Sequence, residues 1–182
     1  MKNIVFLDCE FTDLLCPELL SIGMVSMTGE EHYAELDQEH PSSVATLARA
    51  SDFGRHNGVL EQWGRVPDGA STREQMGHRT AKWLTSQANR FGWPAYVAHD
   101  YAADFELLEQ VLREVGQWRF VRESLQPLNG ATVGAWPAPN EAAERCFSTL
   151  AERGLLRHHA LADAQALRAA FLVYFNLKGG AQ

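Results

Sequence analysis

The sequence predicts a single α/β domain over residues 1–182, in which α-helices flank a mixed central β-sheet. Short apolar runs of strand length come first, and stretches with apolar residues at helical spacing then alternate with further short runs, which is the order of an α/β fold. Hydrophobic residues make up 46% of the chain and charged residues 21%. This balance is typical of a globular domain and excludes a disordered chain.

The first part of the chain is predicted to form strands. Residues 3–9 are a short apolar run, which is typical of a buried central strand. Residues 19–27 and 31–36 are two further runs, and the Thr-Gly-Glu sequence at 28–30 is a turn signal between them. We therefore expect a hairpin here. Residues 37–70 are rich in polar residues, Gly and Pro, and an irregular segment is expected.

The remainder of the chain is predicted to alternate between helices and strands. Apolar residues recur at helical spacing in four stretches, which are residues 72–91, 101–115, 140–153 and 160–176. Two short apolar runs, at 94–98 and 118–121, are expected to be strands. Residues 126–139 hold three Pro and two Gly, so we expect a loop.

Composition restricts the location and the partners of the protein. No apolar run approaches the roughly 20 residues of a membrane span, so no membrane partner is expected. The three cysteines lack CxxC spacing, which argues against a disulfide scaffold or a zinc ribbon and favours a reducing cytoplasm. The net charge of −7 disfavours a polyanion as partner, and nine of the 23 acidic residues lie in residues 1–48.

Two carboxylates continue an apolar face at the end of the first predicted strand. Residues two apart share a face of a strand, so Asp8 and Glu10 follow Ile4 and Phe6 on one side. Burying two neighbouring carboxylates without partners is costly, and a divalent cation removes that cost. The alternative is that both side chains have reached solvent at the strand end.

A third carboxylate, Asp104, lies on the core-facing stripe of the helix predicted over 101–115. The apolar residues of that stripe begin three positions later, at Leu107. The alternative is an acidic residue of the first turn, which the helix dipole favours. Asp100 precedes the helix and is expected to be its N-cap.

A fourth carboxylate, Asp163, lies on an apolar face of the last predicted helix. His158 comes five positions earlier, just before that helix starts, and could reach over the same site from a loop. A lone histidine is more often a surface or core residue, so this pair carries weight only together with the other carboxylates.

The four carboxylates and the histidine suit one chemistry. Two Mg²⁺ or Mn²⁺ ions held by carboxylates can clamp a phosphodiester for attack by water. Histidine, with an unperturbed pKa near ~6.5, suits a general base. Bound cations would also neutralise the carboxylates, so that an acidic chain could accept phosphate.

Three motifs in order resemble the DEDDh 3′–5′ exonucleases, a family that includes RNase T, oligoribonuclease and the proofreading subunit of bacterial replicative polymerases. The D-x-E motif is Asp8-Cys9-Glu10, followed by Phe11-Thr12. The H-[ND]-x-x-x-D motif runs from His99 to Asp104, with Asp100 in place of the commoner Asn, and H-x-A-L-x-D-A runs from His158 to Ala164. The likeness extends over residues 4–175 and is greatest to the small stand-alone RNase T-like exoribonucleases.

The resemblance implies a ribonuclease H-like fold that binds two divalent metal ions, Mg²⁺ or Mn²⁺. It implies a homodimer that hydrolyses single-stranded or short RNA from the 3′ end and releases nucleoside 5′-monophosphates. The residues that match metal ligands are Asp8, Glu10, Asp104 and Asp163. His158 matches the general base, although His159 beside it leaves the register open. Phe11 and Thr12 match the turn that meets the terminal nucleotide.

Other interpretations stay open from the sequence. Arg157, beside His158, is the basic residue that we expect to contact phosphate. The same chemistry on DNA is the nearest rival, because discrimination depends on contacts with the 2′-hydroxyl. A nucleotide- or RNA-binding regulator without catalysis is less favoured, and a structural α/β domain whose acidic residues reach solvent is least favoured.

Overall fold

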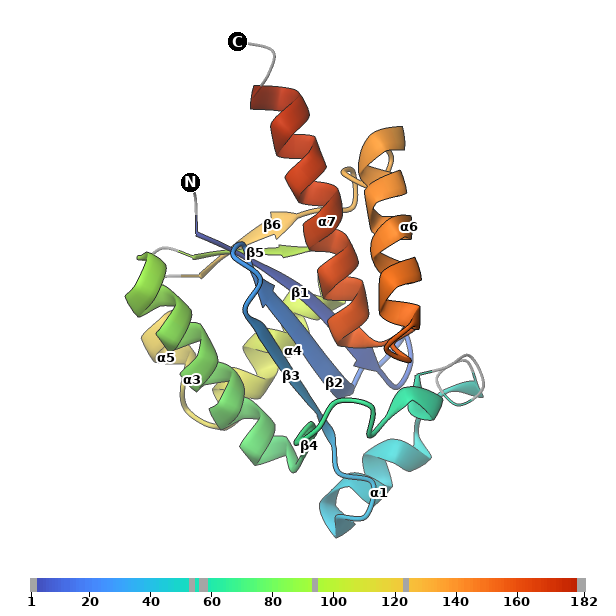
Figure 1. Cartoon of the computed structure of the whole chain (residues 1–182). Helices are drawn as coiled ribbons and strands as arrows, with labels where there is room; N and C mark the ends of the chain where they lie inside the picture. The colour runs from blue at the N-terminus through green and yellow to red at the C-terminus, as the bar shows by residue number, and fades with distance from the viewer. Residues whose placement is uncertain (1–2, 53–54, 56–58, 93–94, 123–124, 180–182) are drawn as a thin grey trace.

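A computed structural model describes residues 3–52, 55, 59–92, 95–122 and 125–179. They form a six-stranded mixed sheet with helices on both of its faces (Figure 1). The prediction of an α/β fold with a mixed central sheet flanked by helices is confirmed. Within the described part of the chain, no helix has both the length and the apolarity needed to cross a membrane.

The sheet has the strand order β4-β3-β2-β1-β5-β6. Its strands are β1 (Ile4–Phe11), β2 (Leu19–Ser26), β3 (Glu31–Leu36), β4 (Ala70–Ser71), β5 (Ala95–His99) and β6 (Leu125–Asn129). The first three strands pair antiparallel as an N-terminal meander, as the predicted hairpin requires. The remaining pairs are parallel, and they are β3 with β4, β1 with β5 and β5 with β6.

The helices divide between the two faces of the sheet. They are α1 (Pro41–Ala48), the 3-10 helix η1 (Leu60–Gln62), α3 (Arg73–Phe91), α4 (Ala102–Glu114), α5 (Trp118–Val121), α6 (Pro137–Ala151) and α7 (Ala160–Gly179). The group α3, α4 and α5 lies on one side, whereas α7 lies against the other side with α6 packed beside it (Figure 1).

The alternation predicted for the first strand is confirmed. Val5 and Leu7 are buried in the core cluster formed with α3 and α4, and Cys9 belongs to the same cluster. Ile4 and Phe6 are buried on the opposite face, where Phe6 meets a ring of α7 edge-on. The two faces of β1 are therefore enclosed by different helices, and the carboxylates that follow Phe6 on its face are directed toward α7.

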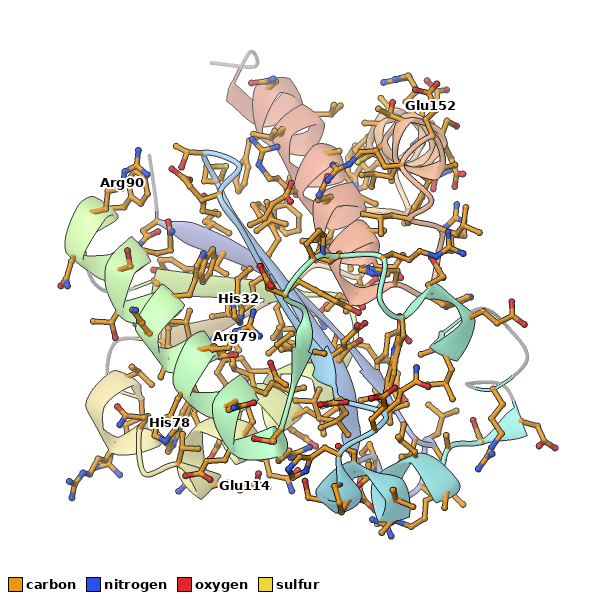
Figure 2. The ribbon with its side chains drawn as sticks, turned by 60° about the horizontal axis from the view of Figure 1, so that its bottom comes forward. His32, His78, Arg79, Arg90, Glu114 and Glu152 are labelled. Carbon is orange, nitrogen blue, oxygen red and sulfur yellow. The ribbon has the colours of Figure 1, made fainter. Side chains whose placement is uncertain are left out.

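Helix α3 is held against β3 by polar contacts as well as by its apolar face. The side chain of Thr72 caps its N-terminus by accepting from the amide of Gln75, and the side-chain oxygen of Gln75 accepts from the amide of Thr72. The Nε2 atom of His32 in β3 lies 3.0 Å from Oγ1 of Thr80 in α3, and the guanidinium of Arg79 donates to the carbonyl oxygen of Tyr33. Figure 2 shows His32 and Arg79 close together between the strand and the helix. These bonds satisfy groups that would otherwise be buried without partners.

The expectation of an irregular segment over 37–70 is wrong in part, because it contains α1 and η1. Helix α1 begins with Pro41 at its first position, and the side chain of His40 accepts from the amide of Ser42. Ser43 is the buried residue of this helix, so almost no apolar periodicity marks it. Arg55 donates to carbonyl oxygens at the end of α1, including that of Leu47.

Two expectations for the region after α4 are also wrong. Residues 118–121 form a helix, in which Trp118 and Val121 share a buried side three residues apart. A run of four residues is too short for periodicity to separate helix from strand. Residues 125–129 form β6 and α6 starts at Pro137, although we expected a loop over 126–139. β6 is an edge strand, where Pro127 costs little.

Gly23 of β2 allows the N-terminus of α7 to lie directly on the sheet. It is the residue paired with Asp8 across the ladder. A Cβ at this position would lie 2.2 Å from the carbonyl carbon of Ala160, the first residue of α7. Because the obstacle is backbone, a side chain here requires the whole helix to move. Gly23 therefore sets how closely the last helix approaches the first strand.

We predict that Gly23→Ala destabilises the fold by about 1–3 kcal/mol, since α7 must shift to admit a methyl group. Chemical denaturation of both proteins measures the difference. Gly134→Ala is the matched control, because a Cβ there meets no atom within 4 Å. Equal stability of Gly23→Ala and the wild type would contradict this account.

Candidate metal and catalytic site

The site begins where β1 extends beyond its parallel neighbour. Ile4, Val5 and Phe6 pair with β5, but the later residues of β1 pair with β2 alone. Asp8 and Glu10 therefore pair with β2 on one side and have no strand partner on the side of β5. β5 ends at His99, and the residues that follow it lie beside Asp8 and Glu10.

Two carboxylates enter from the turn between β5 and α4. Asp100 follows the last residue of β5 and is exposed, whereas Asp104 in the first turn of α4 is buried. The Oδ2 atom of Asp104 accepts from the amide of Tyr101 at 3.3 Å. The expectation that Asp100 caps this helix is wrong, because Tyr101 is the N-cap residue. Asp104 therefore combines the first-turn position with a place on the core-facing stripe.

The remaining groups come from the start of α7. Asp163 lies in its first turn, and its Oδ2 accepts from the amide of His158 at 2.8 Å. The helix N-terminus favours a negative charge at this position. His158 has a φ of 62°, a left-handed conformation that is uncommon for a residue other than glycine. This conformation directs the amide of His158 toward the carboxylate of Asp163.

The structure separates the two adjacent histidines. His158 is exposed and lines the same cavity as the carboxylates. His159 is buried on the other side of the loop, where its ring stacks on Tyr33 at a centroid distance of 4.5 Å. Burial lowers the pKa of His159 to about 4, so it stays neutral. Of the two, His158 is the one placed to act at the site.

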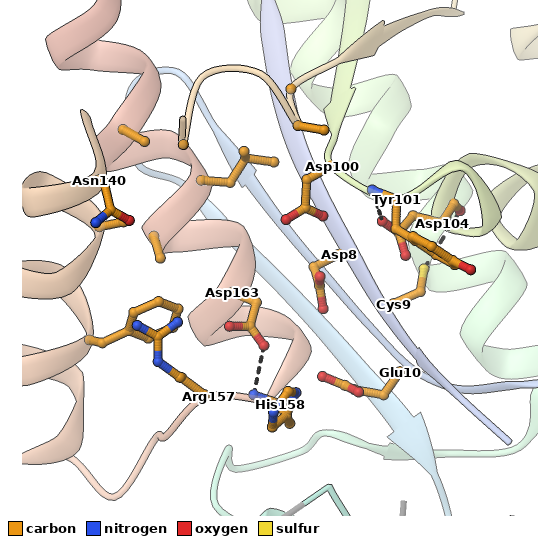
Figure 3. A pocket seen from close by; sticks show the side chains of 18 of the residues that line it. Asp8, Cys9, Glu10, Asp100, Tyr101, Asp104, Asn140, Arg157, His158 and Asp163 are labelled. Atoms are coloured by element: carbon orange, nitrogen blue, oxygen red, sulfur yellow. Dashed lines mark hydrogen bonds between the residues drawn. The ribbon is translucent and has the colours of Figure 1, made fainter. Parts of the chain in front are cut away.

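The five predicted residues converge with Asp100 at one end of the sheet. One group consists of Glu10, His158 and Asp163, and a second consists of Asp8, Asp100 and Asp104. Within each group the possible ligand atoms all lie within 4.8 Å of one another. Figure 3 shows the carboxylates of Asp8, Glu10, Asp100 and Asp163 pointing into the same space. These residues line an open cavity of about 580 Å³, a size that suits a small ligand.

Burial, and then mutual repulsion, raise the pKa values of the carboxylates. Burial and then the charge of Asp163 raise the pKa of Asp8 well above its ordinary value, and Glu10 responds in the same way. Burial and then Asp100 raise the pKa of Asp104 to about 8. Burial raises the pKa of Asp163 to about 7. The site therefore holds more negative charge than its environment stabilises.

The residues fit a bound divalent cation. The Oδ2 atom of Asp8 is buried and has no hydrogen-bond partner among the described residues. A buried carboxylate oxygen without a donor is costly, and a cation would remove that cost. Oxygen donors from several carboxylates are the ligands that Mg²⁺ and Mn²⁺ take. The alternative in which Asp8 simply reaches solvent at the strand end does not hold for this oxygen.

The three residues predicted to contact substrate have different environments. Phe11 lines the cavity and stacks on Tyr101 at a centroid distance of 6.0 Å. Thr12 is fully buried, and its Oγ1 accepts from the amide of Glu18 at 3.1 Å, so its side chain holds the turn. Arg157 also lines the cavity, where it pairs with Glu144 and lies 4.1 Å above the ring of Phe147.

Sequence reasoning missed several residues of the site. Asp100 was expected as a cap and as the residue in place of Asn in the second motif, without a place in the site. Its position directly after a parallel strand beside β1 could have indicated that it shares the site with Asp8. Asn140 and Glu144 line the cavity from α6. Tyr101 lines it from the turn before α4, and Figure 3 shows Asn140 and Tyr101 on opposite sides of the carboxylates. No motif marks Asn140 or Glu144, because their position depends on how α6 packs against α7.

We predict that the metal-free protein loses stability as the pH rises from about 4 to about 8. The folded state keeps protons on Asp104 (pKa about 8) and Asp163 (pKa about 7), which the unfolded chain releases near pH ~4. Mn²⁺ at 100-fold its Kd should raise the Tm by about 5–10 °C at pH 8. At pH 5 the protons compete with the metal, so the rise should be smaller.

Calorimetry with and without EDTA checks this. The Asp8→Asn variant should show a higher Tm than the wild type without metal and a reduced rise with it. A metal-induced rise that is equal at both pH values, or unchanged in Asp8→Asn, would count against the site.

No family model matches the chain, and no curated protein does so. The function has to be inferred from the site itself.

Proposed function

We propose that this protein is a metal-dependent 3′–5′ exoribonuclease of the DEDDh type, which hydrolyses single-stranded or short RNA to nucleoside 5′-monophosphates. One observation carries the proposal. The three motifs are far apart in the sequence, yet Asp8, Glu10, Asp104, His158 and Asp163 line a single open cavity. A structural domain would have no reason to gather four carboxylates there, because their proximity costs stability.

The topology supports assignment to the ribonuclease H-like fold. An antiparallel meander of three strands is followed by parallel strands, with helices on both faces of the sheet. The ligand-bearing residues lie on the central strand β1 and at the N-terminal ends of α4 and α7. Fold alone does not imply function, so the assignment rests on the site.

Two divalent cations would be held by the two groups of side chains. Asp8 belongs to the group with Asp104 and Asp100, and Glu10 belongs to the group with Asp163. When bound, the cations would supply positive charge that stabilises the charge developing on the phosphate and the leaving oxygen. The chain contributes the fixed position of the carboxylates and a low-dielectric wall of β-sheet behind them.

His158 is the proposed general base. It lines the cavity, and one of its ring nitrogens lies within 4.8 Å of carboxylate oxygens of Glu10 and Asp163. Partial burial and then the charge of Arg157 lower its pKa, so that the imidazole is neutral near pH 7 and a ring nitrogen can accept a proton from water. The carboxylate of Asp163 holds the backbone of His158 in place at 2.8 Å.

The substrate end of the cavity suits a nucleotide. Phe11 and Tyr101 offer aromatic faces on which a base can stack. Arg157 is a cation beside His158, and it could exchange its pairing with Glu144 for a phosphate oxygen. Thr12 contributes by shaping the turn that carries Phe11, because its own side chain is buried.

The setting of the protein is part of the proposal. All three cysteines are free, which supports a reducing cytoplasm as the place of action. A homodimer is proposed from the family resemblance.

We predict that Asp8→Asn and Asp163→Asn each lower Mg²⁺-dependent release of nucleotide from an RNA oligomer by at least about 100-fold, because each removes an anionic ligand. Asp68→Asn is the matched control. Asp68 is exposed with a φ of 58°, which asparagine tolerates, and it should retain full activity. Unchanged turnover in Asp8→Asn, or activity that survives EDTA, would refute the catalytic assignment.

We predict that RNA is the preferred substrate. Matched 5′-labelled RNA and DNA oligomers, digested side by side, should show a ladder that shortens from the 3′ end on RNA at least about 10-fold faster. Trimming of DNA alone would favour the proofreading or repair alternative. Binding of both oligomers without cleavage would favour the non-catalytic regulator.

A further inference from the structure

Gln62 is a buried glutamine whose two polar ends both bind the segment that leads into His158. Its Nε2 donates to the carbonyl oxygen of Arg157 at 2.8 Å, and its Oε1 accepts from the amide of Leu156 at 2.6 Å. The side chain is 2% exposed. A primary amide that accepts from the peptide group before Leu156 and donates to the one after Arg157 fixes the path of the backbone between them.

The backbone that Gln62 holds is in an unfavourable conformation one residue later. His158 has a φ of 62°, and such a conformation is unfavourable for a residue other than glycine. It persists where the surroundings determine the chain path. Gln62 fixes the segment before His158, and the stack of His159 on Tyr33 fixes the residue after it. The histidine is thus held from both sides.

Gln62 is itself anchored to the sheet. It is the last residue of η1, and the amide of Gly64 two residues later donates to Glu35 Oε1 at 2.8 Å. Glu35 is a buried residue of β3, and its other oxygen accepts from Tyr33 at 2.7 Å. The contacts form a connection from β3 through η1 to the loop of His158. The same strand supplies Tyr33, so both supports of the histidine depend on β3.

We propose that Gln62 is a positioning residue that sets the orientation of His158 for proton transfer. This inference rests on the proposed function, because it assigns Gln62 to the reaction in which His158 accepts the proton. Gln62 bonds to the backbone of Leu156 and Arg157 and is not bonded to any of the carboxylates. Its loss should therefore lower kcat, because general-base catalysis depends steeply on geometry, with a smaller rise in KM through Arg157 and an unchanged metal affinity.

A double-mutant cycle tests this role. The four proteins are the wild type, Gln62→Met, His158→Ala and the double variant, each assayed for kcat and KM on a short RNA oligomer with Mn²⁺. Gln62→Met should lower kcat about 10- to 100-fold, and His158→Ala about 100- to 10,000-fold. The double variant should lie within about threefold of His158→Ala, since Gln62 then has nothing left to orient.

Gln87→Met is the matched control for the substitution itself. Gln87 is 4% exposed on α3, on the other side of the sheet, and its Oε1 has no partner within the described chain. Its replacement should leave kcat unchanged.

Gln62→Glu is the second variant if Gln62→Met folds poorly, because it keeps the shape and the acceptor for Leu156 but loses the donor to Arg157. It should also lower kcat by a larger factor than it raises KM.

The outcomes separate the two proposals. Losses that multiply in the double variant, or a Gln62→Met protein with wild-type kcat, would overturn the role of Gln62 and leave the nuclease assignment intact. A change confined to KM or to Mn²⁺ affinity would overturn it as well. A wild type without metal-dependent hydrolysis would overturn the proposed function, and the positioning role would fall with it.

Discussion

The mutual repulsion of buried carboxylates is the constraint on which the architecture of the site depends. Asp8, Glu10, Asp104 and Asp163 are brought to one edge of the sheet, together with Asp100, against the cost of desolvation and like charge. Packing in the rest of the fold offsets that cost. The hydrophobic core packs on one face of β1, and α7 packs closely on the other face because Gly23 has no side chain. Packing on both faces of β1 therefore keeps these carboxylates close together, although their desolvation and repulsion favour separation.

The arrangement of strands explains why this edge can hold both charge and a ligand. A parallel strand that ends early leaves its neighbour without a partner on one side, and the chain that follows it enters the free space. β5 ends at this level and β1 continues, so the carboxylates of the longer strand meet those that follow the shorter one. The cavity results from unequal strand lengths, and the carboxyl ends of parallel strands are common places for ligands.

Much of the fold and most of the site could be predicted from the sequence, for identifiable physical reasons. Asp8 and Glu10 were found because alternation along a buried strand is strict, and Asp104 because it interrupts an apolar stripe. Helix α1 was missed because it buries almost nothing, and residues 118–121 because four residues carry no period. Gln62 had no local signal at all. Its importance lies in a contact with residues 156 and 157, which only the folded chain brings near.

The site draws its groups from opposite ends of the chain. Asp8 belongs to the first strand, while His158 and Asp163 belong to the last helix and the loop before it. The β1–β3 meander pairs residues that are close in the sequence, whereas α7 contacts β2 from a position more than 130 residues later. Assembly of the proposed catalytic centre therefore requires that α7 is present and packed on the sheet, and a chain cut before residue 158 would lack the proposed base and one proposed ligand. The centre thus depends on the longest-range packing in the fold, so the proposed activity reports that the first strand and the last helix have come together.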